Sequence, residues 1–162
     1  MDKLVQELIS LFQDLLASHE RQLALAQGRL EAMRAYDVPL LTTLMEREEI
    51  ESQNLEKLEL RRKDVTVRLR RAMGTEPTTT LIAARTAEPQ KSQLLGLAGR
   101  LRQVLEQVER INRINAKVSQ AVVKSLAKVL KIVTGVAQHV GLYNRSGRKA
   151  AVAGIHILEL TA

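Results

Sequence analysis

The chain has 162 residues, no cysteine and a formal net charge of +7. Hydrophobic residues make up 45% of it and aromatic residues only 2%, so the apolar content is aliphatic, as in proteins built from long helices. The absence of cysteine excludes a disulfide framework and a cysteine metal site, and it is compatible with a reducing cytoplasm.

The positive charge belongs to the second half of the chain. Residues 1–73 hold 12 Lys/Arg and 13 Asp/Glu, a net of −1, whereas residues 74–162 hold 13 and 5, a net of +8. A basic half of this kind is compatible with nucleic acid, an anionic membrane or an acidic protein as partner, and it does not choose among them.

Charged residues interrupt both apolar segments that resemble targeting or membrane sequences. Acidic residues break the apolar pattern of residues 1–16, unlike the core of a secretory signal peptide. Three lysines break the most apolar window, about 118–140, which therefore falls short of the ~18 uncharged residues of a membrane span. We expect a cytoplasmic protein without stable membrane insertion.

The first two long stretches predict a helical hairpin. Residues 2–35 place apolar side chains at steps of three and four, which is helical periodicity rather than strand alternation. A short break, YDVP, then supplies Asp37 as an N-cap and Pro39 at a first-turn position. The second helix is expected over 38–73, with Gly74 as its C-terminal stop. So short a break predicts an antiparallel pair.

A third long helix follows a linker. Residues 74–89 are rich in Thr and Pro and include a short helical turn at about 80–85. The third helix is expected over 90–140, with a coiled-coil-like seam. Residues 142–162 lose the periodicity and are expected to form a flexible tail. The predicted fold is all-α: an elongated, coiled-coil-like three-helix bundle, with residues 1–141 as one domain.

Polar residues occupy several seam positions. Glu48, Glu51 and Arg62 interrupt the seam of the second helix, which we expect to be weakly packed there or to lie against polar neighbours. Asn115 falls on the seam of the third helix, where an asparagine often fixes register at a cost in stability. Recognition of a partner is the alternative role for Asn115 and for the nearby Asn112.

Enzyme motifs are missing from the sequence. The three histidines are scattered, the glycines are isolated, and there is no nucleophile elbow or HExxH spacing. We interpret the acidic cluster Glu46, Glu48, Glu49 and Glu51 as a solvated helix face rather than a metal site. The basic run 61–71 is interpreted as the outer face of an ordinary helix, without nucleic-acid binding. No catalytic residue, metal or cofactor is expected.

The second half of the third helix is the clearest candidate for a functional surface. Lys117, Lys124, Lys128 and Lys131 share one face, and most other positions there are apolar. This apolar surface is wider than packing against a hairpin requires, so something must cover the surplus. The hairpin with the tail, a partner protein and a membrane surface are the three possibilities. The membrane is disfavoured by the absence of Trp and Phe from this segment.

Two segments carry a family resemblance. INRINAKVSQAVVKSLAKVLKIV, residues 111–133, places spaced asparagines before an apolar stretch, and LYNRSGR, residues 142–148, adds a Tyr-x-x-x-Gly turn. Together with the order of the helices and the YDVPLL turn, they make the chain similar to the FlgN family of flagellar export chaperones. The chain departs from the family pattern in its longer, apolar ending, AAVAGIHILELTA.

This resemblance implies a cytoplasmic chaperone of the flagellar type III secretion system. Its clients would be the hook-associated proteins of the hook–filament junction, kept from premature assembly and delivered to the export gate. Tyr143 matches the family's tail tyrosine, which is associated with docking to the export-gate protein. The client-binding region of the family maps here onto Ile111, Ile114, Val118, Val122, Leu126, Val129, Leu130 and Val133. The alternative is a structural coiled-coil protein that forms homo-oligomers through the same surface, with no export role.

Overall fold

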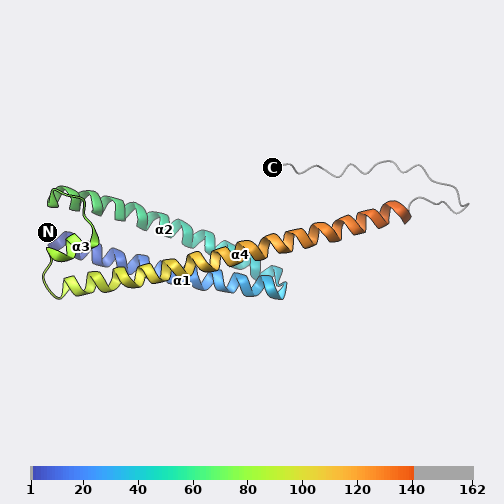
Figure 1. Ribbon diagram of the computed structural model, residues 1–162, viewed down its shortest axis with the longest axis horizontal. Coiled ribbons are helices and arrows are strands. Elements are labelled where there is room, and N and C mark those ends of the chain that lie inside the picture. Colours follow the sequence, from blue (N-terminus) through green and yellow to red (C-terminus); the bar gives the residue numbers. More distant parts are fainter. Residues whose placement is uncertain (1, 141–162) are drawn as a thin grey trace, which may run out of the picture. The chain divides into compact units, whose positions relative to one another are not determined.

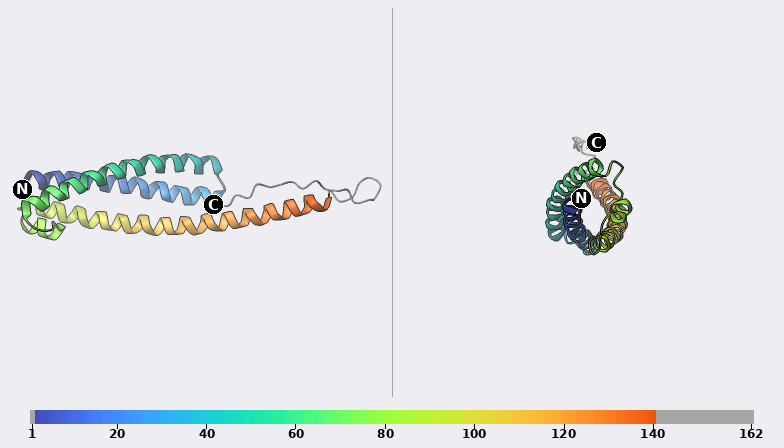
Figure 2. Two further views of the ribbon diagram at one scale, coloured as in Figure 1. Left: turned by 90° about the horizontal axis from the view of Figure 1, so that it is seen from above. Right: turned by 90° about the vertical axis from the view of Figure 1, so that its left-hand side faces the viewer.

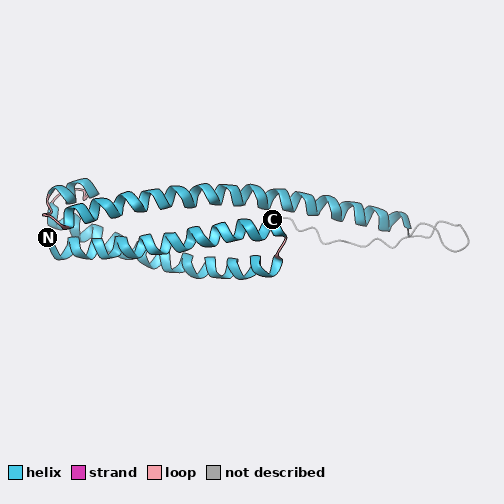
Figure 3. Ribbon diagram, turned by 90° about the horizontal axis from the view of Figure 1, so that it is seen from below, coloured by secondary structure: helices cyan, strands magenta, loops and turns pink. Residues whose placement is uncertain are grey.

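The structure, a computed structural model, describes the backbone of residues 2–140 and the side chains of residues 2–134. Over this range the protein is all-α, as the sequence predicts (Figures 1 and 3). The helices are α1 (Asp2–Ala35), α2 (Val38–Met73), α3 (Thr79–Ala84) and α4 (Gln90–Val140). The tail predicted for residues 142–162, including Tyr143, lies outside the described residues.

The chain divides into two compact units, Met1–Val118 and Ser119–Ala162. The first unit contains α1, α2, α3 and the first part of α4, and the second contains the rest of α4. Compactness of this kind is a property of contacts rather than of independent folding. The single domain expected for residues 1–141 therefore stays a prediction.

Local chemistry explains where the hairpin turns and where α2 ends. Asp37 caps α2, because its side chain accepts a 3.0 Å hydrogen bond from the Leu40 backbone N–H. Gly74 ends α2 in the left-handed region at φ 68°, and its N–H bonds the Arg70 carbonyl. A side chain at φ 68° is strained, so glycine is the residue that this cap favours.

In the first unit α2 runs antiparallel to α1, and the first part of α4 runs parallel to α1 (Figure 2). Hydrogen bonds between α1 and α4 show this direction, because their partners ascend together along both helices. Gln90 pairs with Gln6 at 3.1 Å and Arg100 with Glu20 at 3.2 Å. These pairs also set the register, in which a residue of α4 lies level with the residue of α1 about 80–84 positions earlier.

The apolar core lies at the end of this unit that α3 closes. Leu94 of α4 is fully buried there, and Ile82 and Ala83 bring α3 into the same cluster. The remaining buried members come from α1, α2 and the start of α4: Val5, Leu8, Ile9, Leu11, Leu15, Leu16, Leu55, Val65, Leu69, Met73 and Leu97. Aliphatic side chains at steps of three and four thus form the bundle interior, as the periodicity predicts.

Beyond the apolar core, a charged seam residue of α2 pairs with α1 across the hairpin. Glu51 is buried and accepts hydrogen bonds from the Ser18 hydroxyl and from two Arg21 nitrogens, at 3.1 and 3.0 Å. The bonds from Arg21 are the main reason that the pKa of Glu51 is lowered. The expectation of polar neighbours is therefore confirmed. The interpretation of the acidic cluster as a solvated face holds for the exposed Glu46 and Glu49 and is wrong for Glu51.

The basic run of α2 is integrated into the bundle. Val65 and Leu69 are buried, whereas Arg68 lies on the outside and pairs with Glu7 of α1 at 2.7 Å. Arg70 pairs with Glu76 at 2.6 Å. These arginines already have carboxylate partners within the chain, as expected for the outer face of an ordinary helix.

Candidate functional site

The eight predicted client-binding residues differ in exposure along α4. Ile111, Ile114 and Val118 are half-buried and belong to the first unit. Val122 is also half-buried. The other four are exposed: Leu126 58%, Val129 54%, Leu130 63% and Val133 58%. The uncovered apolar surface is therefore concentrated in the later part of the predicted set.

Two further side chains belong to this surface, Val123 at 64% and Ile132 at 66% exposure. The predicted client-binding set omits both residues. Ile132 lies on the alternating three-and-four seam of α4, whereas Val123 lies beside that seam. At 100° per residue, the exposed apolar positions extend over roughly half of the helix circumference. We call the following set the apolar arc: Val122, Val123, Leu126, Val129, Leu130, Ile132 and Val133.

Hydrogen bonds to α1 fix the position of α4 within the first unit. Four such bonds join residues 80–89 positions apart. They involve Gln90, Arg100, Asn112 and Asn115 of α4, all of which precede the end of the first unit at Val118. In the second unit, the large apolar side chains of α4 from Val123 to Val133 are exposed.

The opposite face of this segment is basic. Lys124, Lys128 and Lys131 are exposed, and the sequence has no acidic residue between Glu109 and Glu159. Among the described residues, the ion pairs of the protein all use arginine rather than lysine. The segment thus combines an apolar half with a positively charged half that no carboxylate of its own neutralises.

Asn112 and Asn115 have different surroundings just before the arc. Asn115 is buried, and its Nδ2 donates a 2.8 Å hydrogen bond to the Ala26 backbone carbonyl of α1. Asn112 is exposed, and its Oδ1 accepts a 3.2 Å bond from Arg29. Arg29 also pairs with Glu48 of α2 at 2.9 Å. These bonds tie α4 to the hairpin and support the register role for Asn115.

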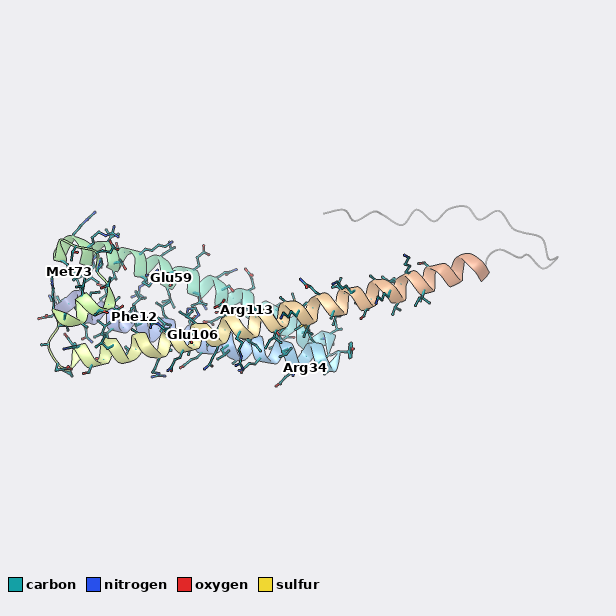
Figure 4. All side chains as sticks on the ribbon, viewed as in Figure 1. Phe12, Arg34, Glu59, Met73, Glu106 and Arg113 are labelled. Carbon is teal, nitrogen blue, oxygen red and sulfur yellow. The ribbon has the colours of Figure 1, made fainter. Side chains whose placement is uncertain are left out.

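Two shallow pockets lie on the first unit. One of about 370 Å³ lies between α1 and α2, and its lining includes Leu25, Ile50 and the Arg21–Glu51 pair. The other, of about 340 Å³, is lined in part by Phe12 and Glu106, which are labelled in Figure 4. No three His, Cys, Asp or Glu side chains in the described part of the chain are placed to hold a metal ion.

None of the helices within residues 2–140 is both long enough and apolar enough to span a bilayer.

Comparisons with known proteins agree with the resemblance. The family model described as FlgN protein matches residues 1–151. Neither the curated proteins nor the solved structures gave a match. The family match covers all four helices and ends within the chain's apolar ending. FlgN proteins are chaperones rather than enzymes, and they bind flagellar proteins. This chain belongs to the FlgN family of flagellar export chaperones.

Proposed function

We propose that this protein is a cytoplasmic chaperone for the hook-associated proteins of the hook–filament junction. It binds these clients through the apolar arc, prevents their premature assembly and delivers them to the flagellar export gate. Membership of the FlgN family supports the chaperone role. The exposure of the apolar arc is the single observation that carries the binding site.

Client binding on this surface is noncovalent and requires no catalytic step. The arc repeats at helical spacing, so an amphipathic helix of a client can pack its apolar stripe along it. Burial contributes about 25 cal/mol per Å² before the cost of association is subtracted. The half-buried Ile111, Ile114 and Val118 precede the arc along α4, and we include them in the proposed site. A client helix on this surface hides the same apolar stripe that it uses in assembly.

Tyr143 is proposed to dock the loaded chaperone at the export gate. It lies outside the described residues, so this role depends on its match to the family's tail tyrosine. A tyrosine suits such a contact, because its ring offers a large area and loses little rotamer entropy on binding.

Co-purification tests the client surface. The tagged protein is compared with Leu126→Asp/Leu130→Asp and with a control, Met45→Asp/Leu60→Asp, which places the same change on exposed side chains of α2. Circular dichroism must show equal helix content in all three. We expect hook–filament junction proteins with the wild type and the control, and their loss with the arc variant.

The same experiment separates the alternatives. Equal recovery of junction proteins by the arc variant would place the client site elsewhere. Recovery of a dimer of this protein alone, which the arc variant breaks, would favour the self-associating coiled coil. For the docking role, Tyr143→Ala is expected to keep the clients and to lose the export-gate protein. Loss of both would mean that Tyr143 acts in client binding instead.

A further inference from the structure

The apolar arc is not covered by the described side chains when the chaperone has no client. Six of its side chains are more than half exposed, which is a large contiguous apolar surface for a monomeric protein. The arc lies in the second unit, Ser119–Ala162. Burial of this surface therefore requires an occupant that the described side chains do not supply.

The chain itself contains a segment of matching chemistry. Ile155, Ile157, Leu158 and Leu160 place four large apolar side chains within six residues. This cluster lies beyond residue 151, where the family match ends. It also contains Glu159, the first acidic residue after Glu109 and thus a counterpart for the basic segment that bears the arc.

The connection between the two segments is long enough for them to meet. Leu130 lies about 15 Å back along the helix from Val140, at 1.5 Å per residue. Residues 141–154 connect Val140 to Ile155 and reach up to about 45 Å when extended. A connection of this length can hold a tethered segment at an effective concentration in the millimolar range. Even weak affinity then gives substantial occupancy.

We propose that residues 155–160 bind the apolar arc of the client-free chaperone as an internal competitor. The segment covers the arc until a client displaces it, so it protects the chaperone from self-association and raises the threshold for loading. The contact itself depends only on the arc and the segment. Its competition with clients rests on the function proposed above.

Disulfide trapping tests the contact directly, because the chain has no cysteine of its own. Leu130→Cys/Leu158→Cys and Leu126→Cys/Leu158→Cys are oxidised at low protein concentration and analysed on non-reducing gels. The control, Leu60→Cys/Leu158→Cys, places the first cysteine on an equally exposed site of α2. We expect rapid bond formation within one chain for at least one arc pair and slow formation for the control.

Three trapping results would overturn the proposal. In the first, the arc pairs react no faster than the control. In the second, the bonds form mainly between chains, which would assign the arc to a second copy. In the third, adding Ile155→Ser/Ile157→Ser to an arc cysteine pair leaves the rate of disulfide formation unchanged. The contact would then not depend on the apolar cluster.

Truncation after Ala151 tests the competition separately. The association of a purified hook–filament junction protein is measured with the full chain and with the truncated chain. If the segment covers nine arcs in ten, removing it strengthens apparent binding about tenfold. Equal binding by both forms contradicts the competition. Absence of client binding by either form contradicts the proposed function and leaves the trapping result as the measure of the contact.

Discussion

Asn115 of α4 donates a 2.8 Å hydrogen bond from Nδ2 to the backbone carbonyl of Ala26 on α1, and its side chain is almost completely buried. Its Oδ1 is also buried and has no hydrogen-bond partner in the described part of the protein. A buried amide satisfied at one end costs stability, and it is retained where it determines the pairing of helices. Asn115 supplies the most C-terminal of the four hydrogen bonds described above between α1 and α4.

Asn115→Leu is expected to leave the free energy of unfolding unchanged or to raise it by about 1 kcal/mol, because an apolar side chain replaces a half-satisfied amide. Asn115→Asp is expected to lower it by about 3 kcal/mol, because a buried carboxylate has no cationic partner there. Urea denaturation measures both values. A loss of more than about 2 kcal/mol in the leucine variant would show that the amide stabilises the bundle rather than only selecting its register.

The Glu51–Arg21 pair predicts how stability depends on pH. The pKa of Glu51 in the folded protein is lowered, first by the Arg21 hydrogen bond. Its contribution is therefore present above the unfolded-state pKa and is lost as pH falls through the lowered folded pKa. Glu51→Gln should lower the free energy of unfolding at neutral pH by about 1–2 kcal/mol and weaken its decline in acid.

Glu48 provides the matched contrast on the same helix. Burial raises its pKa despite the attraction of Arg29, so its charged form is disfavoured in the folded protein. Its contribution is lost as pH rises through the raised folded value, the opposite direction to Glu51. Glu48→Gln is expected to be neutral or stabilising at neutral pH. Denaturant titrations across pH 3–8 compare the two variants, and equal losses at neutral pH would contradict this assignment.

The same Leu→Ala substitution can be made at a buried and at an exposed position of α4, Leu94 and Leu126. Leu94→Ala removes a fully buried side chain and is expected to cost about 2–5 kcal/mol of stability through lost burial and a cavity. Leu126→Ala removes an exposed side chain and is expected to stay within about 0.5 kcal/mol of the wild type. Client affinity should follow the reverse order, once folding is confirmed. Binding unaffected by Leu126→Ala would exclude this residue from the client contact.

The lysines opposite the arc are expected to act on the rate of client association. Lys124→Gln/Lys128→Gln removes two exposed charges without altering the arc. We expect slower association with an acidic client surface, a weaker dependence on salt, and little change in dissociation. Stopped-flow measurements over a range of ionic strength distinguish these effects. A faster dissociation with unchanged association would mean that the lysines contact the client directly in the final complex.

The helices and the existence of an apolar surface on α4 follow from the sequence alone, because both depend on local features. Apolar residues at steps of three and four produce the apolar stripes of the helices. Asp37 begins α2 and Gly74 ends it, each through a hydrogen bond to a residue nearby in the chain. The excess of apolar residues after Lys117 is likewise a property of spacing. For these features, a single helix contains all the information that is needed.

Only the tertiary structure decided which parts of α4 are covered and which polar residues are buried. Within the first unit, α4 is held against α1 by hydrogen bonds between residues 80–89 positions apart, and local sequence patterns do not reveal such distant pairs. The burial of Glu51 depends on Arg21 and Ser18 of another helix, so its position in an acidic cluster predicted a solvated face wrongly. Val123 lies off the seam of α4 and belongs to the apolar arc because its side chain is 64% exposed.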